Sequence, residues 1–383
     1  MNRIFHFRRF ITLPLNPLKG TLVSKKTEMN YGLFALLKSP LGDLGVDELQ
    51  NYGIKLKMLP LSPKNRFRLL IRMKTVYVNE SQPLCELKSG IAATIGFFDG
   101  VHLGHRFLIE QLKDLARKVS MPSAVITFYI HPRNVLQTDY VPELLTTFDE
   151  KLHQLSTTGI DYCIVINFTR ALSEYSAQAF IQNILSEQLH VKYLLIGYDH
   201  KFGKDRTDGF DKYKKYGKAI GVEVVLANQL EEKKVHHSST AIRKMLQKGH
   251  VKDAARLLSY NYKLRGIVVR GDKLGGEIGF PTANVNLFDR DKIIPQKGVY
   301  AVHIKVKEII YKGMLYIGFR PTLFKEGELR VEVNLFDFSG NLYGKSVEIE
   351  FIDHLRGGMK FKQISDLVKQ LEKDRENALK ILR

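Results

Sequence analysis

The sequence contains few cysteines, no long apolar run and little acid near its start. Its two cysteines, Cys85 and Cys163, are too few for a disulfide framework or for a zinc site with four thiolate ligands. No run of about 18 consecutive apolar residues occurs, so we expect no membrane-spanning helix. These absences argue against a disulfide-stapled secreted domain and an integral membrane protein, and they make a cytoplasmic location the default expectation.

Basic residues outnumber acidic ones, and the excess is unevenly distributed. The formal net charge is +19, from 59 Lys and Arg against 40 Asp and Glu. Residues 1–72 carry 13 of the basic and 4 of the acidic side chains, so nearly half of the excess lies in the first fifth of the chain. Such a charge invites a nucleic-acid-binding hypothesis. Because the sequence shows no helix-turn-helix, zinc module or aromatic-interleaved RNA motif, we expect no nucleic-acid partner.

The first 72 residues are patterned differently from the rest. They show no sustained helical or strand period and are interrupted by five prolines. We interpret 1–72 as a basic N-terminal extension, either disordered or read from a start site assigned too far upstream, since Met73 begins a strand-like segment. The lack of acid before Glu28 is an alternative sign of an organellar transit peptide, although serine is scarce. A signal peptide fits less well, because no clean apolar core precedes a small-residue cleavage site.

From residue 73 to 258, apolar β-rich runs alternate with helix-patterned segments, which predicts βα units around a mainly parallel sheet. Strands are expected at 91–97, 124–128, 162–168, 193–197 and 222–226. The segment 107–119 gives one apolar helical face, consisting of Leu108, Leu112, Leu115 and Val119. The segment 176–189 gives another, consisting of Ala177, Phe180, Ile181, Ile184 and Leu185. This is a doubly wound, Rossmann-like α/β pattern.

From residue 259 to 383 the period changes, which predicts a second domain. Five β-rich segments separated by Gly-bearing turns, typical of an antiparallel barrel, are 264–270, 299–306, 309–317, 329–336 and 346–352. The chain closes with a predicted helix over 362–382, whose apolar stripe is Ile364, Leu367, Val368, Leu371, Ala378, Leu379 and Leu382. The fold class is therefore an α/β domain followed by a β-barrel with a terminal helix.

A glycine-rich segment joins the first clear strand to the first clear helix. Residues 94–105 read Thr-Ile-Gly-Phe-Phe-Asp-Gly-Val-His-Leu-Gly-His. A loop at a helix N-terminus presents backbone N–H groups and the positive end of the helix dipole to an anion. His102 and His105 can both donate to phosphate oxygens, so the segment predicts a triphosphate site that is neither a Walker loop nor a dinucleotide fingerprint. For a lone His-x-Gly-His, a structural turn with two surface histidines is the alternative.

The full segment from Gly96 to His105 closely resembles the signature of the bacterial bifunctional riboflavin kinase/FAD synthetase family, whose N-terminal module is a His-x-Gly-His nucleotidyltransferase. Residues 127–133, 197–206 and 238–243 resemble further blocks of that family in the same order, with Ile130 standing where a proline is usual. The resemblance runs from about residue 73 to the end. It implies an FMN adenylyltransferase domain over 73–258 and a riboflavin kinase domain over 259–383.

The resemblance assigns roles in the first domain residue by residue. It implies that ATP is bound by Gly96, Phe97, Asp99, Gly100, His102, Gly104, His105, Asp199, Arg206, Ser239, Thr240 and Arg243, with His102 and His105 catalytic. It places the flavin against Phe128, His131, Pro132 and Phe202. From the residues alone, simpler roles stay open: Ser238–Thr240 could cap a helix beginning near Ala241, and Asp199 with Arg206 could form a salt bridge in a turn.

A second motif, residues 271–284, resembles the riboflavin kinase motif that ends in Pro-Thr-Ala-Asn. The resemblance implies ATP binding by Gly271, Gly275, Gly279, Pro281, Thr282 and Asn284. Its glycines allow a loop to wrap phosphates with backbone groups, and Thr282 and Asn284 offer two neutral oxygens to Mg²⁺. The family usually carries an arginine where Gly276 stands, so one phosphate contact is missing or is supplied by Arg270 or Lys273.

Kinase chemistry also needs a base for the proton of the riboflavin 5′-hydroxyl. Glu332 lies in a strand-like run whose alternation puts Val331, Val333 and Leu335 on the opposite face. The resemblance implies that Glu332 is the catalytic base and contacts the flavin, while the strand pattern alone favours an ordinary solvent-facing glutamate. Arg356 matches a family arginine near the flavin and the nucleotide, although Gly358 departs from the acidic residue that is common nearby.

Together these motifs predict an enzyme that phosphorylates riboflavin to FMN and adenylylates FMN to FAD, using ATP and Mg²⁺ in both reactions. Its partners would be these small molecules, with no membrane or nucleic-acid partner, and it would be a monomer or a weak homo-oligomer. An enzyme with only one activity retained, its kinase weakened by Gly276, is the nearest alternative. A basic nucleic-acid-binding protein is a more distant one.

Overall fold

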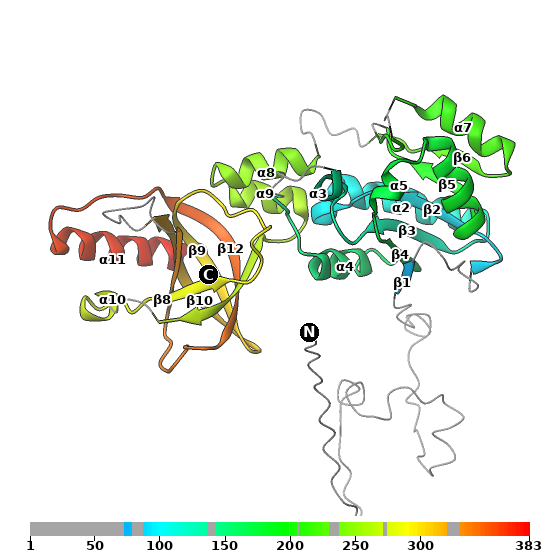
Figure 1. Ribbon diagram of the computed structural model, residues 1–383. Coiled ribbons are helices and arrows are strands. Elements are labelled where there is room, and N and C mark those ends of the chain that lie inside the picture. Colours follow the sequence, from blue (N-terminus) through cyan, green and yellow to red (C-terminus); the bar gives the residue numbers. More distant parts are fainter. Residues whose placement is uncertain are drawn as a thin grey trace, which may run out of the picture. The chain divides into compact units, whose positions relative to one another are not determined.

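A helix-covered parallel sheet and a closed barrel make up the described part of the chain (Figure 1). The computed structural model describes residues 73–78, 87–136, 143–198, 200–204, 207–229, 237–270, 274–319 and 329–383. All of them belong to the unit Leu69–Arg383. The N-terminal segment 1–72, for which an extension was predicted, lies outside the described residues.

Six parallel strands form the sheet in the order β1-β4-β3-β2-β5-β6. Their bounds are β1 Lys74–Val78, β2 Ile91–Ile95, β3 Ser123–Phe128, β4 Tyr162–Ile166, β5 Val191–Ile196 and β6 Glu223–Leu226. Every residue of β2 and β3 is buried, as expected of strands covered on both faces. The chain order reverses at β2, between β3 and β5, and such a switch point is where open α/β sheets bind ligands. The predicted parallel sheet is confirmed.

Some of the helices around the sheet correspond to the predicted segments 107–119 and 176–189, and the others were not predicted. The helices are η3 Asp99–Val101, α2 Leu103–Lys118, α3 Pro132–Leu136, α4 Phe148–Ser156, α5 Arg170–Ser173, α6 Ala177–Ala179, the π-helix η4 Phe180–Gln188 and α7 Phe210–Ala219. The helix α2 begins a turn earlier than predicted, because His102 caps it, and it buries Ile109, Leu112 and Ala116 most deeply. The predicted stripe of α6 and η4 is buried throughout, although its second part has π-helical hydrogen bonding.

Two helices between the sheet and the barrel, α8 Ser239–Gln247 and α9 Val251–Leu258, share the barrel's hydrophobic core. Ile242 and Leu246 of α8 are fully buried in the same cluster as Leu264 and Tyr300 of the barrel. The N-terminal end of α8, in contrast, bonds to the loop that follows β2 in the sheet domain, since Ser239 Oγ donates to the Asp99 carbonyl at 3.0 Å. These helices therefore connect the core of the barrel with the loop at the sheet.

The barrel contains six antiparallel strands in the closed order β10-β11-β8-β7-β12-β9. Their bounds are β7 Lys263–Val269, β8 Ala283–Leu287, β9 Gly298–Val306, β10 Ile309–Phe319, β11 Leu329–Leu335 and β12 Ser346–Arg356, and the short α10 Leu274–Glu277 precedes β8. The five predicted strands are confirmed. The sixth, β8, was not predicted, because its five residues include two asparagines, which have low strand propensity.

The terminal helix α11, Ile364–Ile381, packs against the outside of the barrel. Ala378 and Leu382 contribute to a small core with Ala301, Met314 and Phe336. The prediction that Ile364 and Leu379 belong to the buried stripe is wrong, because Ile364 is 64% exposed and Leu379 is 37% exposed. The inner face instead includes Asp374, which is 2% exposed because Arg356 of the barrel binds its carboxylate.

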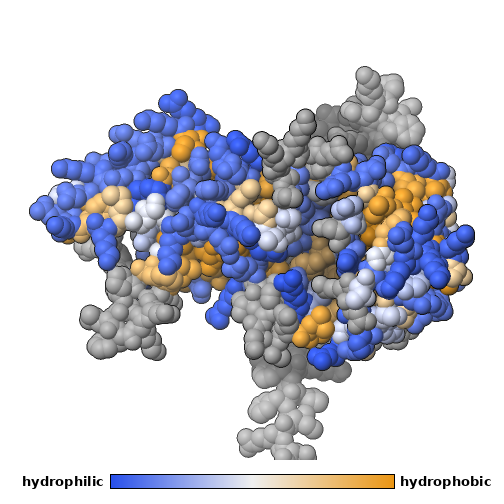
Figure 2. Space-filling view, turned by 90° about the horizontal axis from the view of Figure 1, so that it is seen from above, coloured by the Kyte–Doolittle hydropathy of each residue, from blue (hydrophilic) through white to orange (hydrophobic). Residues whose placement is uncertain are grey.

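Polar and charged side chains cover most of the face shown in Figure 2, and the apolar residues there form separate patches. Among the described residues, no helix is both long enough and apolar enough to cross a membrane.

Candidate active sites

The loop after β2 is held in an unusual backbone conformation by a buried carboxylate. Phe98, Gly100 and Val101 have φ values of 56°, 80° and 38°, and a positive φ is costly for a β-branched residue such as Val101. Asp99, 3% exposed, accepts hydrogen bonds from the backbone N–H groups of Leu145 and Thr146 at 3.0–3.1 Å. Its carboxylate also pairs with the Arg243 guanidinium. These contacts fix the loop at the switch point of the sheet.

His102 and His105 stack on each other at the start of α2. Their ring centroids are 3.7 Å apart with an interplanar angle of 19°, and His102 accepts the first-turn hydrogen bond from the His105 N–H. A side chain at Gly104 would meet the His237 carbonyl at 3.0 Å and the His102 ring at 3.2 Å, so the close stacking favours glycine there. The twelve-residue motif therefore builds a tight turn around two imidazoles.

Burial keeps both imidazoles neutral near neutral pH. It lowers the pKa of His102 to about 4, with smaller contributions from His237 and Arg243. Burial likewise lowers the pKa of His105 well below 6.5, helped by His102. Within the described part of the chain, the buried Nδ1 of His105 has no hydrogen-bond partner. An anionic phosphate placed there would favour the protonated form and accept its proton in a hydrogen bond.

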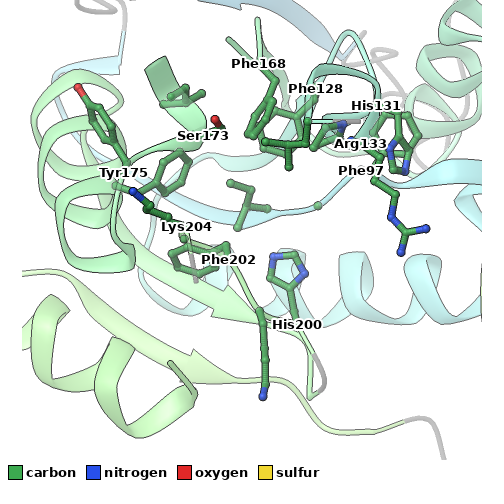
Figure 3. A pocket seen from close by; sticks show the side chains of 18 of the residues that line it. Phe97, Phe128, His131, Arg133, Phe168, Ser173, Tyr175, His200, Phe202 and Lys204 are labelled. Carbon is green, nitrogen blue, oxygen red and sulfur yellow. Dashed lines mark hydrogen bonds between the residues drawn. The ribbon is translucent and has the colours of Figure 1, made fainter. Parts of the chain in front are cut away.

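Two adjoining cavities open where the sheet strands end, and Figure 3 shows side chains that line the larger one. The larger, about 740 Å³, is lined by the predicted residues Gly96, Phe97, Phe128, His131, Pro132, Phe202, Thr240 and Arg243. The smaller, about 290 Å³, is lined by the predicted residues Gly96, Phe97, Asp99, His105, Ser239 and Arg243. The structure thus brings the histidine loop and the α8 N-terminus together with the residues that follow β3. Gly100, His102 and Gly104 support this loop and do not line either cavity, whereas Asp199 and Arg206 lie outside the described residues.

Aromatic rings form the walls of the larger cavity. Figure 3 shows Phe128 and Phe168 across the cavity from Phe202. Phe128 and Phe168 pack edge to face at 5.4 Å, and Phe202 stacks on the buried Tyr213 at 4.3 Å. Such walls suit a planar aromatic ligand.

Several residues of this site were missed from the sequence. They are Phe168, Tyr175, Phe180 and His200 in the wall of the larger cavity, and Lys151 behind it. Phe168 carries one usable signal, since it follows a buried strand of the parallel sheet by two residues. Lys151 carries none, because it stands in an ordinary amphipathic helix.

Ser238 also has the simpler role left open by the sequence. Its hydroxyl accepts a hydrogen bond from the Ala241 N–H at 3.2 Å and caps α8. Ser239 and Thr240 lie in the first turn of that helix, and each lines one of the two cavities. The block therefore combines a helix cap with residues that face the site.

In the barrel, the pairing of β8 with β11 places the second predicted site together. Asn284 is the cross-strand partner of Glu332, and Ala283 is the partner of Val333. Asn334, on the same face of β11 as Glu332, donates from its side-chain amide to the Pro281 carbonyl at 2.7 Å. The Pro-Thr-Ala-Asn segment and the candidate base are thus adjacent although about 50 residues separate them in sequence.

The short turn α10 folds against the same segment. A Cβ atom on Gly275 would lie 2.4 Å from the Phe280 carbonyl and 3.0 Å from Thr282 Oγ1, so this approach needs glycine. Gly276 has open space around it, since a Cβ atom there would meet no other atom within 4 Å. Gly271 and Lys273 lie outside the described residues, and Arg270 is exposed.

Arg356 has a structural contact at the far side of the barrel. Its Nε and Nη2 atoms bind the Asp374 carboxylate of α11 at 2.7–3.0 Å. In either direction around the barrel, two strands lie between β12, which carries Arg356, and β11, which carries Glu332. A flavin contact by Arg356 stays a prediction. In the structure, Arg356 anchors the terminal helix by binding Asp374.

Comparison with known proteins bears on both sites. A family model described as FAD synthetase matches residues 85–241, and one described as riboflavin kinase matches residues 258–382. A bifunctional riboflavin kinase/FMN adenylyltransferase of Haemophilus influenzae is 40% identical over 292 residues, which are 76% of this chain and 93% of the relative. This chain belongs to that bifunctional family. The corresponding protein of Listeria monocytogenes is 36% identical over 311 residues, covering 80% of this chain and 97% of the relative.

A solved structure shares the fold over most of the chain. It is described as a macrolide-efflux protein from Streptococcus pneumoniae, and it matches with a TM-score of 0.71 and 32% identity. The match covers 79% of this chain and 97% of the other. This similarity supports the fold, whereas the activity follows from membership of the bifunctional family.

The family membership confirms both activities predicted from the motifs. The protein is a bifunctional enzyme that phosphorylates riboflavin to FMN and adenylylates FMN to FAD, with ATP, riboflavin and FMN as substrates. The family models follow the same order as the two folds, with the sheet first and the barrel second.

Proposed function

We propose that the two adjoining cavities at the sheet are the FMN adenylyltransferase site, with the triphosphate in the smaller and the flavin in the larger. The observation that carries this assignment is that the cavities share Gly96, Phe97, His131 and Arg243. The FMN phosphate would attack the α-phosphorus where they meet. His105, Ser239 and Arg243 would hold the phosphates as pyrophosphate leaves, and the aromatic walls would hold the flavin rings.

Asp99, Gly100, His102 and Gly104 act in this proposal by shaping the nucleotide loop. Asp99 has its carboxylate engaged by Arg243 and two backbone N–H groups, so it positions the arginine that faces both cavities. We also propose that Asp199 and Arg206 bind the nucleotide, and this assignment rests on the family resemblance alone.

In the barrel, Glu332 would accept the proton of the riboflavin 5′-hydroxyl as that oxygen attacks the γ-phosphorus of ATP, while the bond from the γ-phosphorus to the bridging oxygen breaks and ADP leaves. Gly271, Gly275, Gly279 and Pro281 would shape the phosphate loop. The support is the cross-strand pairing of Glu332 with Asn284, which places a carboxylate beside the Pro-Thr-Ala-Asn segment.

The oxygens of Thr282 and Asn284 fit a magnesium site. Mg²⁺ prefers oxygen ligands, and it commonly uses one or two protein ligands together with waters and substrate phosphates. Both residues are at least partly exposed and follow the glycine-rich turn, with Thr282 Oγ1 near the position of Gly275. Bound there, the ion would neutralise charge on the transferring phosphate. We propose that both riboflavin phosphorylation and FMN adenylylation require Mg²⁺.

Other parts of the proposal rest on the sequence. The division of the chain at 258/259 follows the change in period and the start of the barrel. The free, buried thiol of Cys163 suits a reducing cytoplasm. We also propose a monomer or weak homo-oligomer without a nucleic-acid partner.

The experiment that tests the assignments is chromatographic product analysis of the purified chain. One reaction contains riboflavin, ATP and magnesium, and a second contains FMN in place of riboflavin. We expect FMN and then FAD in the first and FAD in the second, with neither product when magnesium is removed by a chelator. FAD from FMN without any FMN from riboflavin would remove the kinase assignment, and undiminished turnover in the chelator would remove the metal site.

Restoring the arginine that the family usually carries at Gly276 should strengthen the kinase. An arginine fits the open space there and would add a charge-assisted contact to ATP phosphate. We expect Gly276→Arg to lower the KM for ATP in riboflavin phosphorylation roughly tenfold. The matched control is Gly209→Arg at the start of α7 in the sheet domain, where space is also open. An unchanged or higher KM in Gly276→Arg would show that no phosphate contact is missing at this position.

A further inference from the structure

A buried lysine lies directly behind the adenylyltransferase cavities. Lys151 of α4 is 3% exposed. Its Nζ donates to the Phe128 carbonyl at 2.9 Å, to the Phe97 carbonyl at 3.2 Å and to Thr127 Oγ1 at 3.2 Å. All three ammonium protons therefore have neutral acceptors, and each acceptor lies at or just beyond the carboxyl end of β2 or β3.

The acceptors belong to the segments that build the site. Phe97 lines both cavities and Phe128 lines the larger one. The ammonium lies 4.1 Å from the centre of the Phe97 ring, a cation–π contact. The Phe97 ring also packs against the His131 ring, with the two ring centres 4.4 Å apart. Lys151 thus contacts both the loop after β2, at Phe97, and the end of β3, at Thr127 and Phe128, with one side chain.

Such a position is costly for a cation. Among the residues that the structure describes, Lys151 forms no ion pair, and the carboxylate that influences it most, Asp99, is engaged by Arg243. Burial therefore lowers the pKa of Lys151 to about 8. A methionine of similar length would avoid the desolvation cost, but it would remove the ammonium donor from the Phe128 carbonyl and leave the Phe97 carbonyl with only the Thr127 hydroxyl as a side-chain donor among the described residues.

We propose that Lys151 is a positioning residue for adenylyl transfer, whose ammonium joins the ends of β2 and β3 and so fixes the distance between the nucleotide loop and the flavin wall. The inference rests on the assignment of the two cavities proposed above. Its positive charge also adds to the potential that an incoming triphosphate meets, because it already acts on His105 through space.

The first test is Lys151→Met, with Lys113→Met as the matched control. Lys113, on α2, donates to the Thr158 carbonyl and to Glu110, away from both cavities. We expect Lys151→Met to lower kcat for FAD formation about 100-fold, the size of effect that a 1 Å misplacement can have. Riboflavin phosphorylation by the same protein should stay within about twofold, as should both activities of the control.

The second test is the pH profile of the unaltered enzyme. The titratable groups facing Lys151 are Asp99 from η3, Cys163 from β4 and His105 from α2. Burial raises the pKa of Cys163 to about 12 and keeps that of His105 well below 6.5, so neither changes charge between pH 7 and 9.5. The lysine is charged below its pKa, so the ratio of FAD formation to FMN formation should fall as pH rises through about 8. Lys113→Met should keep this fall.

Three results would overturn the proposal. They are FAD formation by folded Lys151→Met within about threefold of the unaltered enzyme, an equal loss of both activities, and a flat ratio from pH 7 to 9.5. The pH profile needs no variant, so it tests the proposal even if Lys151→Met does not fold. A failure of the cavity assignment is distinguishable, because His105→Ala would then also leave FAD formation unchanged.

Discussion

Glu332→Ala is expected to abolish FMN formation from riboflavin while FAD formation from supplied FMN continues. Removing a general base typically costs 10²–10⁴-fold, and we expect about 10³-fold here. The reason is geometric: Glu332 is the cross-strand partner of Asn284, and an alcohol attacks poorly until its proton has an acceptor. The measurement is the initial rate of each product, separated by chromatography, in parallel reactions with riboflavin and with FMN.

A matched glutamate separates a catalytic effect from a loss of barrel stability. Glu348 also lies in a barrel strand and pairs with Lys263 at 2.8 Å, away from the Pro-Thr-Ala-Asn segment. Glu348→Ala should retain kinase activity within about threefold, because a partly exposed ion pair contributes little to stability. Glu332→Gln should fail like the alanine variant, since it keeps the shape but not the basicity. Loss of both products in Glu332→Ala would contradict independent sites.

The parts of the fold that could be predicted are those in which one physical signal dominates. The strands β2 and β3 are buried on both faces, so they read as continuous apolar runs. The five predicted barrel strands are each bounded by turns. The short β8 could not be found, because its pairing with β7 and β11 outweighs the low strand propensity of Asn284 and Asn286.

The candidate sites were predictable where chemistry is concentrated in one segment and not where the fold brings distant residues together. The histidine loop and the Pro-Thr-Ala-Asn segment are local motifs. In contrast, Lys151 reaches the Phe97 and Phe128 carbonyls from a helix whose sequence shows only an amphipathic pattern. The anchoring of Arg356 by Asp374 depends on where α11 docks, and that docking also explains why Ile364 is exposed instead of buried.

His105→Ala should give the complementary result, in which FMN accumulates at the normal rate and FAD does not form. The buried Nδ1 of His105 has no partner among the described residues and His105 lines the smaller cavity, so in the proposed site this imidazole donates to a phosphate oxygen of ATP. Deleting one preorganised donor to a developing charge costs about 10²–10³-fold in kcat. The measurement is FAD formation from FMN, with kcat and the KM for ATP determined separately.

The separation of kcat from KM decides what His105 does. If the imidazole holds the phosphates equally in the ground state and in the transition state, KM rises and kcat is retained; if it acts chiefly as charge develops on pyrophosphate, kcat falls with little change in KM. We expect the second outcome, because burial keeps the imidazole neutral before the substrate binds, and the further negative charge that develops on the departing pyrophosphate favours its protonation more than the ground-state phosphates do. His153→Ala, at an exposed position on α4, is the matched control and should leave both constants unchanged. Unaltered FAD output from His105→Ala would remove this histidine from the adenylyl site.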